Sequence, residues 1–397
     1  MNNTKQIFGF IGASLSLLLL FSASASPIPL YGHYAQILSI DKSELAMTAV
    51  MYFAGTVISL VFFARLSNYW GRKITIYLIL ILGIIGCTLF IFISSSFMLM
   101  FARFIQGISC GMASSTVTAY LIDTEPKNSG LGTAFSSGGS NLGLSIGAIG
   151  TGLFVQFGGV SSLNFSFELI SVLLLMCILL ISLGRESISL KKGIVHSLKP
   201  QIKVPKNIQD MLLPLACTVV AGWSVGGFYQ SYSATICMQI FAIENTTIIS
   251  LVFISLIAPI AFGAVLAKQI NPFKAQSYGM LGYVIGLALI YLSLFSGNII
   301  LFCLVNIITG IMEGIMFTGS MRTILDLVCI EDRAGVLSLI YIISYLGAVI
   351  PNLVVSEVAY MFDLKELILG FAILGFICYL ILLLDRYVKT RIVKITA

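Results

Sequence analysis

Long apolar runs recur along the chain and limit the folds it can adopt more than any other feature does. A helix needs roughly 20 apolar residues to cross a bilayer core of about 30 Å, because each residue adds ~1.5 Å. Twelve runs of about this length occur, at 7–31, 44–63, 74–93, 97–119, 131–153, 165–184, 211–233, 247–267, 278–296, 299–320, 334–356 and 366–384. A helix satisfies its own backbone groups in lipid, so the runs predict an all-α polytopic membrane protein with transmembrane helices throughout.

The composition agrees with a chain that lies in lipid. Hydrophobic residues make up 58% of the 397 residues and charged residues 10%, against about 25% charged in an ordinary soluble domain. The net charge of +6 includes no basic run interleaved with aromatic residues, so we expect no nucleic-acid partner. The eight cysteines form no C-x-x-C pair and therefore indicate no zinc site and no disulfide framework.

Basic residues predict the orientation of the helices, because Lys and Arg are retained on the cytoplasmic side. With the N-terminus inside, all but three of the 22 Lys and Arg residues fall in cytoplasmic segments. Lys42 and Lys365 lie outside, and Arg103 lies within a helix. We therefore expect a multi-pass protein of the cell inner (plasma) membrane with both termini in the cytoplasm.

The first apolar run has two interpretations. Lys5, the run itself and Ala23-Ser24-Ala25 imitate a secretory signal with its cleavage site. The run continues to Tyr31, however, which makes it long enough to span. We expect it to be retained as the first helix, although the charge bias of the remaining helices is the same in either case.

A basic, proline-containing segment at 185–210 divides the chain. It separates an N-terminal six-helix bundle (1–184) from a C-terminal six-helix bundle with a short cytoplasmic tail (211–397). Two parallel halves of this kind are typical of secondary transporters. An orientation signal and a tether attracted to anionic lipid explain the charge of the segment better than a ligand site does.

A charged cytoplasmic motif lies between the second and third predicted spans, where residues 64–73 read A-R-L-S-N-Y-W-G-R-K. Gly71 permits a tight backbone turn, and Arg72 and Lys73 are charges that stay in the cytoplasm. Asn68 can cap a helix terminus with its amide but cannot form an ion pair.

A second motif, R-F-I-Q-G at 103–107, places a charge inside a predicted span. A charge there costs at least about 2.5–3.5 kcal/mol, so Arg103 should face a cavity or a partner. The alternative is an arginine near the membrane boundary whose side chain extends to water. We favour the cavity because Gln106 lies one turn further along on the same face.

A third pattern is a stripe of glycines at Gly139, Gly143 and Gly147 in the fifth predicted span. Glycine every four residues lets a neighbouring helix approach closely. Simple helix packing explains the stripe fully.

These three patterns resemble the signatures of the major facilitator superfamily, namely G-x-L-x-D-R-x-G-R-K, R-x-x-Q-G and the antiporter motif G-x8-G-x3-G-P-x-x-G-G. The resemblance implies two pseudo-symmetric six-helix bundles, a central cavity lined by the first, fourth, seventh and tenth helices, and a cytoplasmic loop that locks the halves together in the outward-facing state. Asn68 stands where the family has an acid, and Leu144 stands where the antiporter motif has its proline. The resemblance therefore predicts a differently wired lock and supports antiport only weakly.

Polar residues within the cavity-lining helices are the candidates for coupling and substrate binding. Glu313 is the most deeply placed acid, and since burial disfavours its charged form, it could bind and release a proton. The alternative is a carboxyl satisfied at a helix contact. We predict coupling or gating roles for Glu313, Arg103, Gln106, Asn68, Gly71, Arg72 and Lys73. The predicted substrate cavity contains Asn306, Thr309, Trp223, Gln230, Tyr229, Ser26 and Asn141.

The sequence thus predicts a secondary active transporter, with proton-coupled export of a small organic molecule (a drug, siderophore or metabolite) by alternating access. A proton symporter or facilitator that imports a small metabolite is the nearest alternative, and a non-transporting membrane sensor is a distant one. His33 and His196 lie on opposite sides of the membrane without catalytic partners, so we expect no enzyme. We expect no cofactor and no metal, with a proton as the coupling ion. We expect a monomer whose partners are a small substrate and the lipid bilayer.

Overall fold

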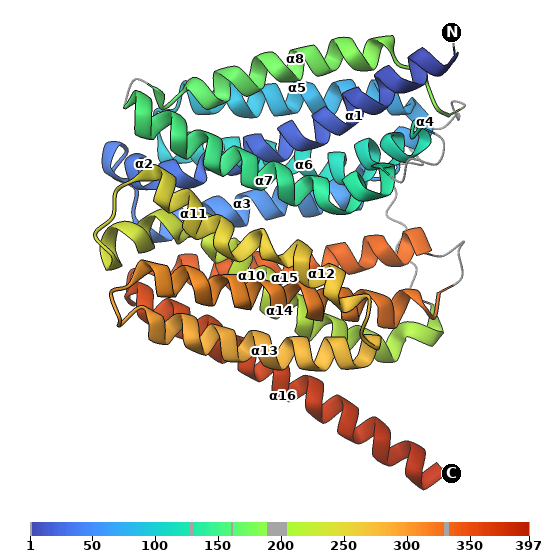
Figure 1. Ribbon diagram of the computed structural model, residues 1–397, viewed down its shortest axis with the longest axis vertical. Helices are drawn as coiled ribbons and strands as arrows, with labels where there is room; N and C mark the ends of the chain where they lie inside the picture. Colours follow the sequence, from blue (N-terminus) through green and yellow to red (C-terminus); the bar gives the residue numbers. More distant parts are fainter. Residues whose placement is uncertain (1, 127–130, 160–161, 189–204, 329–332, 397) are drawn as a thin grey trace. The chain divides into compact units, whose positions relative to one another are not determined.

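The computed structural model describes residues 2–126, 131–159, 162–188, 205–328 and 333–396, and every regular element in these ranges is a helix (Figure 1). The first half contains α1 (Asn2–Ala25), η1 (Ile28–Leu30), α2 (Tyr31–Ile37), α3 (Lys42–Phe62), α4 (Ser67–Trp70), α5 (Arg72–Ile91), α6 (Ser96–Asp123), α7 (Leu131–Gly158) and α8 (Phe165–Leu183). The second half contains η3 (Lys206–Ile208), α10 (Gln209–Ile240), α11 (Thr246–Ile257), α12 (Pro259–Ala267), α13 (Pro272–Ser293), α14 (Ile299–Leu325), α15 (Arg333–Val358) and α16 (Leu364–Thr396).

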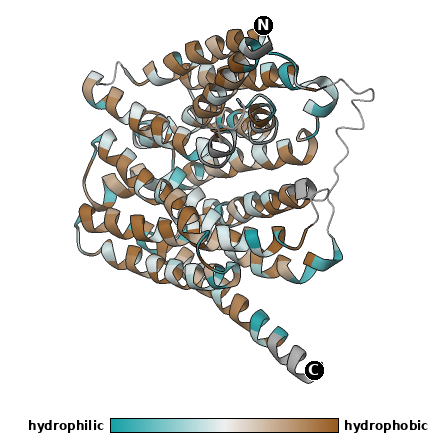
Figure 2. Cartoon of the chain, turned by 45° about the vertical axis from the view of Figure 1, so that its right-hand side comes forward, coloured by the Kyte–Doolittle hydropathy of each residue, from teal (hydrophilic) through white to brown (hydrophobic). Residues whose placement is uncertain are grey.

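The helices have the lengths and the composition of membrane spans. Among the described residues, 11 helical segments are long and apolar enough to cross a membrane. The helix α7, with 28 residues, lies at the remaining predicted position. Apolar residues run along the helices, and hydrophilic residues gather mostly at helix ends and connections (Figure 2). The prediction of an all-α polytopic membrane protein is confirmed.

Helix ends follow local sequence signals. Asp41 begins α3 with a capping box to Glu44, and Ser95 and Asn298 cap α6 and α14 by accepting backbone N–H bonds. Proline has no N–H to continue a helix, and α1 ends at Ala25, shortly before Pro27. This early end determines the geometry of the site described below.

The backbone contacts divide the chain into two compact units. The first comprises Met1–Pro200 with Gln230–Met238 and Ile243–Leu251, and the second comprises Gln201–Tyr229, Gln239–Ala242 and Val252–Ala397. Residues 189–204, most of the predicted linker with His196, lie outside the described part of the chain. The domain boundaries 1–184, 185–210 and 211–397 therefore stay a prediction.

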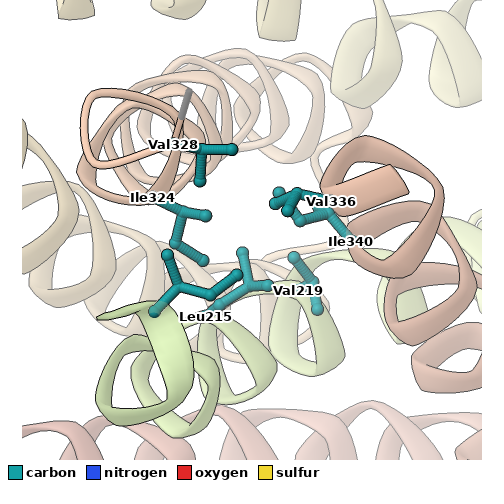
Figure 3. Packing of buried hydrophobic residues seen from close by; sticks show 7 residues of the cluster. Leu215, Val219, Ile324, Val328, Val336 and Ile340 are labelled. Atoms are coloured by element: carbon teal, nitrogen blue, oxygen red, sulfur yellow. The ribbon is translucent and has the colours of Figure 1, made fainter. Parts of the chain in front are cut away.

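Each unit has its own packing. In the first, α1 packs against α6, α7 and α8, and α6 packs against α3 and α5. In the second, α14 packs against α12 and α13, and α13 packs against α16. One core cluster of the second unit joins α10, α14 and α15, and the sticks of Figure 3 show how Leu215, Val219, Ile324 and Ile340 converge.

Candidate functional site

Arg103 is fully buried in the first unit, at 0% exposure. Its Nη1 donates to the carbonyl oxygen of Ser24 at 2.5 Å and to Oε1 of Gln106 at 2.9 Å. Its Nη2 donates to Oε1 of Gln230 at 2.8 Å, and Gln106 Nε2 donates to the carbonyl oxygen of Ala23 at 2.8 Å. The structure thus brings together three residues that the sequence predicted for the site, and the guanidinium lies among protein groups.

The end of α1 explains why these carbonyls can accept. The last four carbonyls of a helix have no intrahelical partner and carry a partial negative charge. Because α1 ends at Ala25, the carbonyls of Ala23 and Ser24 are free to accept from α6. The predicted cavity residue Ser26 is buried and donates to the carbonyl of Ser22 at 2.9 Å, still within this segment.

Aromatic side chains surround the guanidinium. Arg103 Cζ lies 4.4 Å from the ring centroid of Tyr52, which is a cation–π distance. The hydroxyls of Tyr31 and Tyr34 and the Nε of Arg103 are buried without a hydrogen-bond partner among the described residues.

Glu313 is the corresponding buried ionisable group of the second unit, at 6% exposure. Its Oε2 has no hydrogen-bond partner in the described part of the chain. Gly222 of α10 makes room for the carboxyl, because a Cβ there would lie 2.8 Å from Glu313 Oε1 and 3.0 Å from Met316 Cε. The site can therefore hold a neutral carboxylic acid, because burial removes water from the carboxyl and disfavours its charged form.

The other predicted residues of α14 are buried on the same helix. Asn306 accepts from the hydroxyl of Tyr229 at 2.8 Å and donates to Ser255 Oγ at 3.1 Å. Thr309 donates to the carbonyl of Val305 and packs against Gly286, where a Cβ would collide with it. Tyr229 and Asn306, predicted separately, thus form one hydrogen-bonded pair.

Trp223 lies in an aromatic group of the second unit. Its ring is T-shaped to Tyr345 at 4.7 Å, and its centroid lies 6.0 Å from Phe317 and 6.5 Å from Tyr341. Trp223 and Phe317 also pack against the core cluster of Figure 3, so this group joins α10, α14 and α15.

The charged motif at residues 64–73 forms a polar network in the first unit. Gly71 has a φ of 99°, a conformation that favours glycine, and it precedes α5. Arg72 Nε lies 3.3 Å from Asp123 Oδ2, and the backbone N–H groups of Arg72 and Lys73 donate to the two oxygens of Glu186 at 3.0 and 3.1 Å. Asp123 and Glu186 thus supply negative charge near the motif in which Asn68 replaces the acid.

The remaining residues of this motif have simpler surroundings. Lys73 Nζ donates to the carbonyls of Ser182 and Gly184, at the end of α8, at 3.0 and 2.8 Å. Asn68 is half-buried on α4, and its side chain has no hydrogen bond to a described residue. These contacts tie α5 to α8 inside the first unit.

The glycine stripe of α7 faces α1. A Cβ at Gly139 would lie 2.9 Å from Leu17 Cδ2, one at Gly143 would lie 2.5 Å from the Leu18 carbonyl, and one at Gly147 would collide with Ser22. The hydroxyl of Ser22 donates to the Gly143 carbonyl at 2.9 Å. Asn141, a predicted cavity residue on the same helix, is half-buried, and its carbonyl accepts from Ser145.

Sequence reasoning missed several groups around Arg103. The carbonyls of Ala23 and Ser24 are backbone atoms, and only the Pro27 helix end could have indicated them. Tyr31 and Tyr52 look like ordinary aromatic residues of apolar segments. Asp123 lies at the end of α6 and Glu186 just after α8, and charge at the end of a span is expected and carries little information.

These helices and motifs define an integral membrane protein of a transporter fold. The sequence model of the Major Facilitator Superfamily matches residues 13–296, and the chain belongs to this family. The resemblance inferred from the motifs is therefore confirmed.

Relatives and solved structures agree with this assignment. The quinolone resistance protein NorA of Staphylococcus aureus is 26% identical over 234 residues, which cover 58% of this chain and 58% of NorA. The nucleoside transporter NupG superposes with a TM-score of 0.75 at 12% identity, covering 95% of this chain and 99% of NupG. A D-xylose–proton symporter superposes with a TM-score of 0.75 at 16% identity, over 96% and 97% of the two chains. The xylose transporter XylE from E. coli, in an inward-open conformation, gives 0.71 at 15% identity, over 94% of each chain. The sequence match with NorA spans less than two thirds of that protein. The solved structures establish the major facilitator fold.

Proposed function

We propose that this chain is a secondary active transporter that exports a small organic molecule in exchange for protons. Membership of the Major Facilitator Superfamily supports transport, and the 26% identity with a quinolone resistance protein supports export of an organic compound. We further propose that it lies in the plasma membrane as a monomer with both termini in the cytoplasm. In this proposal the proton is the coupling ion and no cofactor is needed.

Glu313 carries the proposal of proton coupling. It is an acidic side chain buried within a membrane span, and its Oε2 has no partner among the described residues. A carboxyl in such a place is neutral when enclosed and can ionise when water reaches it, because water stabilises the charged form. A transporter that alternately encloses and exposes this group would carry one proton each cycle.

Replacement of Glu313 by glutamine tests this role, because the amide has the size of the acid but cannot release a proton. In everted vesicles, we expect Glu313→Gln to abolish uptake of a fluorescent quinolone driven by a pH gradient, while exchange of quinolone without a gradient continues. Glu168→Gln is the matched control, because Glu168 is an exposed acid at the start of α8. Gradient-driven uptake that is unchanged in Glu313→Gln would remove this residue from the mechanism.

Import by proton symport is the second candidate, and a D-xylose–proton symporter shares the fold. The same vesicles distinguish the two directions, because an exporter takes up substrate in exchange for internal protons and a symporter takes it up with external protons. Uptake that requires an acidic exterior in everted vesicles would favour symport and overturn export.

A further inference from the structure

The positive charge of Arg103 is buried in the first unit without a counter-charge. Its acceptors are the Ser24 carbonyl and the amide oxygens of Gln106 and Gln230, and all three are neutral. Of the ion pairs among the described residues, Arg72–Asp123 and Lys389–Asp385, neither involves Arg103. A guanidinium stays protonated in proteins, so this side chain keeps a full charge that the surrounding dipoles only partly offset.

The hydrogen-bond donors around Arg103 also outnumber their acceptors. A guanidinium has five N–H groups, the described residues supply three acceptors, and Nε has none. Several donors that lack acceptors beside one uncompensated cation match a carboxylate, whose two oxygens accept in a plane and carry one negative charge.

The three acceptors of Arg103 differ in how firmly they are held. Gln106 is fixed to the end of α1 through its bond to Ala23, and Ser24 accepts with its backbone. Gln230 makes a single hydrogen bond among the described residues and is more exposed, at 9% against 2% for Gln106. An incoming anion would displace Gln230 at the smallest cost, because an amide oxygen is a weaker acceptor than a carboxylate.

We propose that Arg103 binds the carboxylate of the transported molecule, and that Gln230 is the acceptor that this carboxylate displaces. The proposal rests on the proposed transport function and names the substrate class, a small organic monoacid. One uncompensated charge fits one carboxylate, and the Tyr52 ring over the guanidinium provides aromatic surface beside it.

Gln230→Glu provides the main variant, because it places a permanent carboxylate opposite Arg103 and so competes with any acid. Gln276→Glu is a matched control in the second unit. Gln276 is likewise buried, at 2% exposure, and its Oε1 accepts from Nη2 of Arg386 at 2.7 Å. The two variants make the same exchange beside two different arginines, Arg103, which is buried, and Arg386, which is half-buried.

The experiment measures thermal unfolding of the full chain in detergent at increasing concentrations of 2-naphthoate, with 2-naphthamide as the neutral analogue of the same shape. We expect naphthoate to raise the Tm saturably in the unmodified protein and in Gln276→Glu, and naphthamide to leave it unchanged. In Gln230→Glu we expect binding weakened at least about tenfold, since the charge-assisted pair is already formed. The ligand-free Tm of Gln230→Glu should equal or exceed that of the unmodified protein, which shows that the variant is folded.

Four results would overturn the proposal. The first two are a Tm of the unmodified protein that naphthoate leaves unchanged, and an equal rise in Tm with naphthamide. The other two are a rise in Tm with naphthoate that persists unchanged in Gln230→Glu, and the same rise with chloride alone, which would mean binding of an inorganic anion only. Binding in detergent needs no proton gradient. Glu313→Gln should therefore keep the naphthoate shift while losing coupled transport, and the two proposals can fail separately.

Discussion

Arg103 and Glu313 are both ionisable and both buried within membrane spans, but their surroundings differ. Arg103 has three hydrogen-bond acceptors and an aromatic ring over its guanidinium. Glu313 has an oxygen without a partner and a glycine beside it. A guanidinium cannot lose its proton in a protein and needs such a built environment, whereas a carboxyl can become neutral and needs only space. The comparison supports our proposal that the first unit holds a fixed charge and the second an exchangeable proton.

The largest effect on stability is expected at Arg103. Arg103→Leu leaves the Ser24 carbonyl and the amide oxygens of Gln106 and Gln230 without their donor, and each buried unsatisfied group costs about 1–3 kcal/mol. Removing the charge from the span returns about 2.5–3.5 kcal/mol. We expect a net decrease of about 2–4 kcal/mol in the free energy of unfolding, measured by thermal or denaturant unfolding in detergent.

Arg103→Lys keeps the charge and some N–H donors but has no planar fork of donors. It should recover part of the stability lost in Arg103→Leu, because the ammonium can donate to some of the same acceptors. A lysine variant as unstable as the leucine variant would show that these acceptors need the guanidinium fork itself. A leucine variant as stable as the unmodified protein would show that the acceptors around Arg103 do not stabilise the fold, and would contradict the difference drawn between Arg103 and Glu313.

A smaller effect is expected at Gly222, beside Glu313. Gly222→Ala places a Cβ 2.8 Å from Glu313 Oε1, and the carboxyl must move because it is the flexible end of its side chain. We expect gradient-driven transport to fall several-fold while the free energy of unfolding changes by about 1 kcal/mol. The rates of uptake in everted vesicles and the Tm in detergent measure the two quantities.

Gly226→Ala controls for the change from glycine to alanine within α10, because a Cβ there meets no atom within 4 Å. It should leave transport unchanged and stabilise the helix slightly. Equal losses of transport in the two variants would mean that α10 needs glycine for its flexibility, and that the space beside Glu313 is irrelevant.

The smallest effect on stability is expected for Glu313→Gln. If the enclosed carboxyl is already neutral, glutamine replaces one uncharged group of similar size with another, and unfolding should change by less than about 0.5 kcal/mol. Unfolding experiments on the variant in detergent provide the measurement. A strong loss of stability would show instead that the charged form is held by partners in the folded protein, as Arg103 is.

The fold could be predicted from the sequence because the physical rule behind it is strict. Backbone groups in lipid must bond within their own segment, so each apolar run of sufficient length has to be a helix. The first predicted span, 7–31, runs past the end of α1 at Ala25, and Pro27 explains why the helix stops there. Packing partners are less predictable, because the glycines of α7 are compatible with any close neighbour and the structure places them against α1.

The site could be predicted only in part. Helical spacing placed Arg103 with Gln106, because neighbours on one helix follow from periodicity. Contacts between helices do not follow from it, so the bonds from Arg103 to Gln230 and to the Ser24 carbonyl were not foreseen. A backbone carbonyl becomes available only where a helix ends and another side chain reaches it, which is a property of the packed structure.

The most direct test of the central claim, that Glu313 exchanges a proton during transport, measures the proton itself. Proteoliposomes are loaded with a quinolone and a pH-sensitive dye and are then diluted into buffer without substrate. We predict that outward movement of the substrate acidifies the interior in the unmodified protein and in Glu168→Gln, and leaves the pH unchanged in Glu313→Gln. Acidification at the same rate in Glu313→Gln would contradict the account.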